Sequence, residues 1–163
     1  MTVITHDLPK FAEIEILPLA DVHIGDPLLD KKMLDKFMTE VMGSENKYVI
    51  VNGDILNWAS RNSVSDIYTE EISPNEQIDK ACELLEPIKD RILVMIDGNH
   101  EERARKSEGI SPMYQVAKRL DIFDVYSEGA YLLFISFGKS QGRENRKMIY
   151  SLYGRHRTSG GKR

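Results

Sequence analysis

Short polar motifs rich in Asp and His occur at three places in this sequence of 163 residues. Asp21 and His23 form the first motif, Asp54 the second, and the adjacent pair Asn99 and His100 the third. Residues i and i+2 of an extended segment point to the same side, so Asp21 and His23 can ligate one ion. Carboxylate, imidazole and amide ligands together suit Mn, Fe or Zn better than a soft thiolate site does. The residue types therefore indicate a divalent metal site.

Each motif directly follows a segment that we expect to be a strand. Apolar runs too short for buried helices predict strands at 13–19, 48–51 and 92–96. The carboxyl ends of parallel strands meet at one edge of an open α/β sheet, which is where such sheets bind ligands. Taken singly, each motif is more often a turn, a solvated surface or a helix start. Their order at three successive strand ends favours a shared site.

Helical patterns separate these strands. Apolar residues at three- and four-residue steps predict a helix over 27–41, and we interpret Met33, Met38 and Met42 as helix packing. A capping box at 73–76 predicts a second helix, and Ser111 followed by Pro112 opens a third. Further strands are predicted at 122–126, 131–137 and 147–153. The alternation of strands and helices indicates an α/β fold that ends in a hairpin-like sheet.

The three motifs resemble the first three motifs of the calcineurin-like metallophosphoesterases. They read Asp21-x-His23, Gly53-Asp54 and Gly98-Asn99-His100-Glu101. The likeness covers about residues 14–105, and a Gly-rich segment after His156 is similar to that of phage and bacterial phosphoesterases. The resemblance implies one domain over 1–163 with a four-layer α/β/β/α sandwich.

The resemblance also implies a set of metal ligands. Asp21 and His23 would hold one ion, Asp54 would bridge two, and Asn99 with His156 would hold the second. Two divalent ions are expected, of Mn, Fe or Zn, and a bridging hydroxide would attack phosphorus. The implied activity is metal-dependent hydrolysis of phosphomonoester or phosphodiester bonds.

Other residues are assigned to catalysis and substrate binding. With Asp54 as the bridging ligand, the resemblance implies that His100 donates a proton to the leaving oxygen, and we expect Glu101 to keep His100 protonated. A long polar loop over 57–71 offers Asn57 and Arg61 as substrate contacts. Arg103 follows the third motif, and its guanidinium either faces a phosphate or lies on a solvated helix face. In the same loop Trp58, the only tryptophan, either covers a base or belongs to the packing.

The family's closing Gly-His-x-His motif does not occur in this sequence, in which His156 is the last histidine. We therefore expect the chain to lack the family's C-terminal part and the second sheet to be incomplete. Three explanations stay open: a truncated or split product, ligands from another subunit, or a degenerate site. The alternative function is a non-catalytic remnant that serves as a metal-binding or protein-interaction scaffold.

Composition limits the class of protein. The chain is 41% hydrophobic and 29% charged, which is typical of a globular domain. Its longest apolar run falls well short of the roughly 20 residues that a membrane-spanning helix needs. The single cysteine, Cys82, fits a reducing compartment. We expect a cytoplasmic protein that contacts no membrane.

Charge is distributed unevenly along the chain. The net charge is −4, yet residues 138–163 contain eight Lys or Arg residues and one acid. This basic segment is either a phosphate-binding edge, which favours nucleotides or nucleic acid as substrates, or a solvated turn and chain end. The predicted strand at 147–153 would expose an edge that invites pairing, so we also expect a homo-oligomer.

Overall fold

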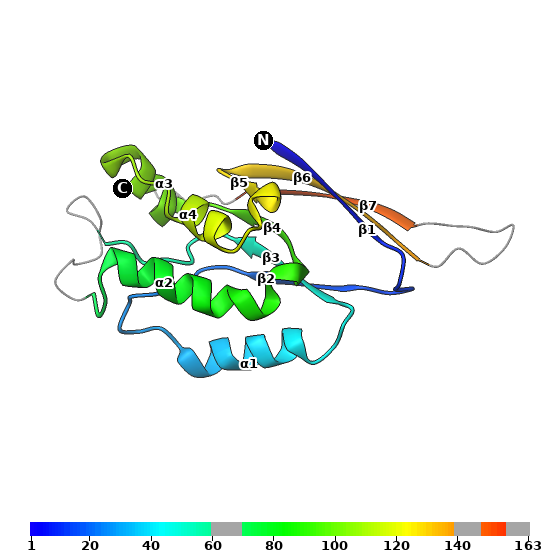
Figure 1. Ribbon diagram of the computed structural model, residues 1–163, viewed down its shortest axis with the longest axis horizontal. Coiled ribbons are helices and arrows are strands. Elements are labelled where there is room, and N and C mark those ends of the chain that lie inside the picture. Colours follow the sequence, from blue (N-terminus) through cyan, green and yellow to red (C-terminus); the bar gives the residue numbers. More distant parts are fainter. Residues whose placement is uncertain (60–69, 139–147, 156–163) are drawn as a thin grey trace, which may run out of the picture.

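A computed structural model describes residues 1–59, 70–138 and 148–155, which form two β-sheets and a set of helices (Figure 1). The first sheet has the strand order β2-β3-β4-β5, and all its neighbouring strands are parallel. Its strands are β2 (Glu15–Leu19), β3 (Lys47–Asn52), β4 (Ile92–Ile96) and β5 (Tyr126–Ser127). Every residue of β4 is buried, because this central strand has covered faces on both sides.

The helices connect the parallel strands of this sheet. They are α1 (Lys31–Met42), α2 (Pro74–Leu85), α3 (Asn99–Glu108) and α4 (Pro112–Arg119), with the 3₁₀ helices η1 (Glu86–Arg91) and η2 (Phe123–Val125). Helices α1 and α2 cover the face of the four-stranded sheet that is turned away from the second sheet (Figure 1). The predicted capping box is present at Ser73 and Glu76, where each side chain accepts the other residue's backbone N–H.

The second sheet has the order β1-β6-β7 and packs against the first. It contains β1 (Thr2–Leu8), β6 (Ala130–Phe137) and β7 (Met148–Arg155). Alternate residues of β6 are buried between the two sheets, namely Tyr131, Leu133, Ile135 and Phe137. The ring of His6 also crosses this interface, with Nε2 2.8 Å from the carbonyl oxygen of Leu93. Side-chain packing and this hydrogen bond together fix the second sheet on the first.

The structure confirms the predicted mixed α/β fold with two sheets, and five predicted strands lie within two residues of their observed positions. The prediction for 122–126 is wrong. The chain turns at Asp121, which has a φ of +58°, and then forms η2, so pairing with β4 begins only at Tyr126. Strand β1 was not predicted from the sequence.

Helix α1 also differs from its prediction. It begins at Lys31 because the Asp30 carboxylate accepts the backbone N–H of Met33 at 3.0 Å and caps the helix. Only Met38 and Val41 of this helix are buried, which confirms the packing interpretation for Met38. Met33 is 71% exposed and Met42 48%, so the interpretation is wrong for these two.

Strand β7 lies at the edge of its sheet and exposes the side chains of Ile149, Tyr150 and Tyr153. Pairing of two copies along this strand stays a prediction. No helix in the described part of the chain combines the length and the apolar character that crossing a bilayer requires.

Packing between the sheets predicts that Leu→Ala substitutions at two neighbouring positions of β6 lower the free energy of unfolding by unequal amounts. Leu133 is fully buried, whereas Leu132 lies on the opposite face of the strand and is half-buried. We expect Leu133→Ala to lower the free energy of unfolding by about 2–5 kcal/mol, because it leaves a cavity between the sheets. Leu132→Ala is the matched control. Equal losses for both variants in urea denaturation would contradict this packing.

Candidate metal centre

The loops that follow β2 and β3 lie side by side because their backbones continue the pairing of the two strands. The N–H of Asp21 donates to the carbonyl of Gly53 at 3.2 Å, and that of His23 donates to the carbonyl of Asp54 at 3.1 Å. One residue further, Ile24 N–H donates to another carbonyl of the second loop at 2.8 Å. The first two motifs are therefore aligned by main-chain hydrogen bonds.

Three residues of these motifs have a left-handed backbone. The φ angles of Asp21, His23 and Asp54 are +53°, +53° and +52°. Such angles are uncommon for residues with a Cβ atom and cost about 1–3 kcal/mol each, and they cluster at functional sites. Their occurrence at three of the five motif residues points to a site whose shape is maintained against this cost.

The ends of β3 and β4 meet at two glycines. A Cβ atom on Gly98 would lie 2.2 Å from the backbone nitrogen of Asp54 and 2.3 Å from its Oδ1. A Cβ atom on Gly53 would lie 2.5 Å from the Cα of Gly98. Gly98 itself has a φ of −92°, so it is required for close approach rather than for a sharp turn.

A buried carboxylate fastens this contact. Glu101 is fully buried and accepts backbone N–H bonds from Asp54 at 3.0 Å, Leu56 at 3.0 Å and Gly98 at 2.9 Å. Burial raises the pKa of Glu101, and the hydrogen bond from Leu56 opposes that rise. The carboxylate that we expected to keep His100 protonated instead accepts three backbone N–H groups and so joins the loop after β3 to the loop after β4.

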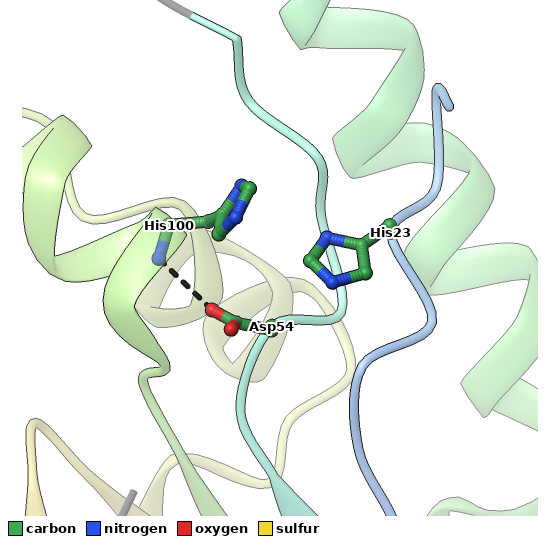
Figure 2. Close-up of side chains that lie close together, drawn as sticks. All are labelled: His23, Asp54 and His100. Carbon is green, nitrogen blue, oxygen red and sulfur yellow. Dashed lines mark hydrogen bonds between the residues drawn. The ribbon is translucent and has the colours of Figure 1, made fainter. Parts of the chain in front are cut away.

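His23, Asp54 and His100 converge from three different segments (Figure 2). Each offers one ligand atom, and these atoms lie within 4.8 Å of one another. The backbone N–H of His100 donates to Oδ1 of Asp54 at 2.9 Å, and the two imidazole rings lie 4.6 Å apart at 67°. We call these three residues the His–Asp–His cluster. The structure thus unites members of all three motifs.

The ring nitrogens of the cluster fit a cation. Nδ1 of His23 is buried and has no hydrogen-bond partner among the described residues. Nδ1 of His100 bonds the carbonyl oxygen of Asn57, which only accepts, so this nitrogen carries the proton and Nε2 is the nitrogen left for a ligand. Burial lowers the pKa of His100, which favours the neutral imidazole that metals bind.

The other predicted residues lie around the cluster. The side chain of Asp21 is 67% exposed, with Oδ1 3.9 Å from Nε2 of His23. Asn99 is the first residue of α3 and lines a hollow of about 300 Å³ together with Arg103. Two guanidinium nitrogens of Arg103, Nε and Nη2, are buried without a hydrogen-bond partner in the described part of the chain. Arg103 therefore has unused donors close to the third motif.

The remaining predicted residues are two neighbours in the loop after β3 and two residues elsewhere in the sequence. Asn57 contacts His100 through its backbone carbonyl, and its side-chain amide donates to Glu70 at 3.3 Å. Its role as a substrate contact stays a prediction. Trp58 is only 3% exposed and its indole N–H donates to Glu108 at 3.0 Å, which confirms the packing interpretation. Arg61 and His156 lie outside the described residues.

Sequence reasoning missed a buried acid at the end of β4. Asp97 is 3% exposed, and its Oδ1 accepts the hydroxyl of Tyr126 at 2.9 Å. Burial raises the pKa of Asp97 to about 7, which the hydroxyl of Tyr126 opposes. Arg105 lies 3.8 Å from its other oxygen. An Asp that directly ends an apolar strand was the available signal, but its partners come from β5 and α3, so the sequence does not reveal them.

The family model of the calcineurin-like phosphoesterases matches residues 14–158 of this chain. The chain therefore belongs to the calcineurin-like phosphoesterase family. No curated protein and no solved structure gives a significant match. The family suggests metal-dependent hydrolysis of phosphate esters, and the His–Asp–His cluster is compatible with that chemistry.

The contact between the two glycines predicts that Gly98→Ala displaces Asp54. We expect affinity for Mn²⁺, measured by isothermal titration, to fall about 10–100-fold, as it does when groups that orient metal ligands are changed. Gly129→Ala is the control, because a Cβ atom there meets nothing within 4 Å. Unchanged Mn²⁺ affinity in the folded Gly98→Ala variant would contradict the assignment of Asp54 as a ligand.

The three N–H bonds that the Glu101 carboxylate accepts predict that Glu101→Gln strongly destabilises the fold. In Glu101→Gln an amide NH₂ replaces one carboxylate oxygen and faces backbone N–H donors, which leaves buried groups unpaired. We expect the free energy of unfolding to fall by about 2 kcal/mol or more. Glu102→Gln, a substitution of its half-exposed neighbour on α3, should change little. Equal chemical-denaturation midpoints for the two variants would argue against this role of Glu101.

Proposed function

We propose that this protein hydrolyses phosphomonoester or phosphodiester bonds at the His–Asp–His cluster, with two divalent ions of Mn, Fe or Zn. The observation that carries the proposal is the convergence of His23, Asp54 and His100 within 4.8 Å from three separate segments. Left-handed backbone at His23 and Asp54 supports it, since that cost accompanies functional geometry.

Within the cluster, His23 and Asp54 would hold the ions. Bound divalent ions would supply the positive charge that activates water and neutralises the phosphate. His23 offers its unpartnered Nδ1, and Asp54 offers a carboxylate whose Oδ1 is oriented by the N–H of His100. Asp21 and Asn99 flank the cluster on opposite sides, in the first and third motifs, and are proposed as further ligands.

His100 is suited to proton transfer. The carbonyl of Asn57 fixes the ring and its tautomer, so Nε2 is the nitrogen that can carry a second proton to the leaving oxygen. Burial lowers the pKa of His100, which makes its protonated form a stronger acid. The unused donors of Arg103 would orient the phosphate in a fixed fork.

Two substitutions test the proposal by separating metal content from turnover. We expect Asp54→Asn to lower both the bound Mn²⁺ and the hydrolysis of p-nitrophenyl phosphate and bis-p-nitrophenyl phosphate. His100→Asn should lower turnover by about 10²–10⁴-fold with little change in metal content, because it removes the proton donor. His6→Asn is the control, since His6 lies between the sheets and bonds Leu93.

The outcomes distinguish the possible roles. Equal loss of metal and turnover in His100→Asn would remove His100 from the acid role and make it a ligand. Absence of turnover by the unaltered protein with Mn²⁺, Fe²⁺ or Zn²⁺ would contradict the proposal and favour a non-catalytic scaffold.

A further inference from the structure

A pocket of about 420 Å³ adjoins the cluster on the side of β2. One wall is the segment that carries Asp21 and His23, and the opposite wall is the first half of α1. Pockets of this size bind small organic molecules. The first wall also carries residues of the proposed metal site. A substrate whose phosphate lies at that site could therefore extend its other end into this pocket.

The wall formed by α1 is apolar and partly uncovered. Leu34 and Phe37 are half-buried, and Met33 is 71% exposed at the rim. The apolar stripe of α1 continues to Met38 and Val41, which are buried against the sheet. The second half of this stripe thus packs on the protein, whereas the first half faces a pocket. Burial of this surface by a ligand would be favourable.

The acidic residues of the pocket disfavour a ligand with several phosphate groups. Its lining contains the carboxylates of Asp21, Asp26 and Asp30 and, among the described residues, no Lys or Arg. Asp26 and Asp30 each accept a backbone N–H, of Leu28 at 2.8 Å and of Met33 at 3.0 Å, which holds their charge at the rim. A second phosphate group placed beside α1 would lie against Asp26 and Asp30, which are not among the proposed metal ligands, and would meet like charge there.

The opposite side of the cluster has the opposite character. The sheet order places the backbone of His23 after β2, that of Asp54 after β3 and that of His100 after β4, so these segments follow one another along one edge while their side chains converge. Beyond His100 lies the hollow lined by Arg103 and by Lys106, which is paired with Glu102 at 2.7 Å. The guanidinium of Arg103 therefore lies at one end of this edge, and an apolar pocket with an acidic rim lies at the other.

We propose that the pocket beside α1 receives an uncharged, apolar leaving group of a small phosphate ester, while the phosphate faces Arg103. This inference rests on the proposed phosphoesterase function and specifies its substrate class. It favours aryl or alkyl phosphates over nucleic acid, whose neighbouring phosphates would lie against Asp26 and Asp30.

Methionine methyl NMR of the metal-free protein tests occupation of the pocket without any turnover. Titration with α-naphthol, the alcohol of α-naphthyl phosphate, should shift the signal of Met33. The signal of Met42, which is 48% exposed at the far end of the same helix, should not move. An unmoved Met33 signal would overturn the inference, whatever the enzyme hydrolyses.

Kinetics with Mn²⁺ test the link to the substrate. Met33→Glu should lower kcat/KM for α-naphthyl phosphate by about tenfold or more, because it places a charge against the leaving group. The value for glycerol phosphate should stay close to that of the unaltered protein, and Met42→Glu should leave both substrates unaffected. Equal losses for the two esters in Met33→Glu would contradict a leaving-group pocket.

The two proposals fail in different ways. Hydrolysis of glycerol phosphate or of an oligonucleotide without preference for α-naphthyl phosphate would overturn the pocket's role and leave the phosphoesterase function intact. Binding of α-naphthol without turnover of any ester would overturn the phosphoesterase function, and with it the role of the pocket in catalysis.

Discussion

The ends of β3 and β4 approach so closely that neither Gly53 nor Gly98 can carry a side chain. Glu101 holds this contact by accepting N–H bonds from both strand ends, and Asp54 is placed by it directly. The remaining geometry follows, because the loop after β2 pairs with the loop after β3 and so brings His23 to Asp54. One close backbone contact between two strands therefore determines where the residues of the His–Asp–His cluster lie.

The sequence predicts what local patterns encode. The strands at 48–51 and 92–96 are continuous apolar runs, and the helix after Ser73 has its capping box within four residues. The three motifs were found because each follows such a strand. Strand β1 was missed because it buries only Ile4 and gains its place by parallel pairing with β6, about 130 residues away. Long-range pairing leaves no local pattern to detect.

In the candidate site, too, local sequence patterns predict some features and long-range contacts determine the others. Residue types identified His23, Asp54 and His100, and Figure 2 shows them together. What each neighbour does was not readable: Glu101 was expected to serve His100, yet it bonds backbone groups of the two loops, and the carbonyl of Asn57 serves His100 instead. Hydrogen bonds to the main chain depend on where the backbone lies in space, and residue types carry little information about that.

The left-handed backbone at Asp21 and Asp54 has an evolutionary consequence. Asn is the side chain that best shares this conformation with Asp, and it lacks the negative charge. A change from Asp to Asn at either position would remove a negative charge from this edge of the sheet while adding no steric strain. Glu101 and the glycines would still assemble the loops, so descendants of this protein can keep its architecture after the charge of the site has changed. The residues that assemble the loops and the residues that set this charge are thus separate sets.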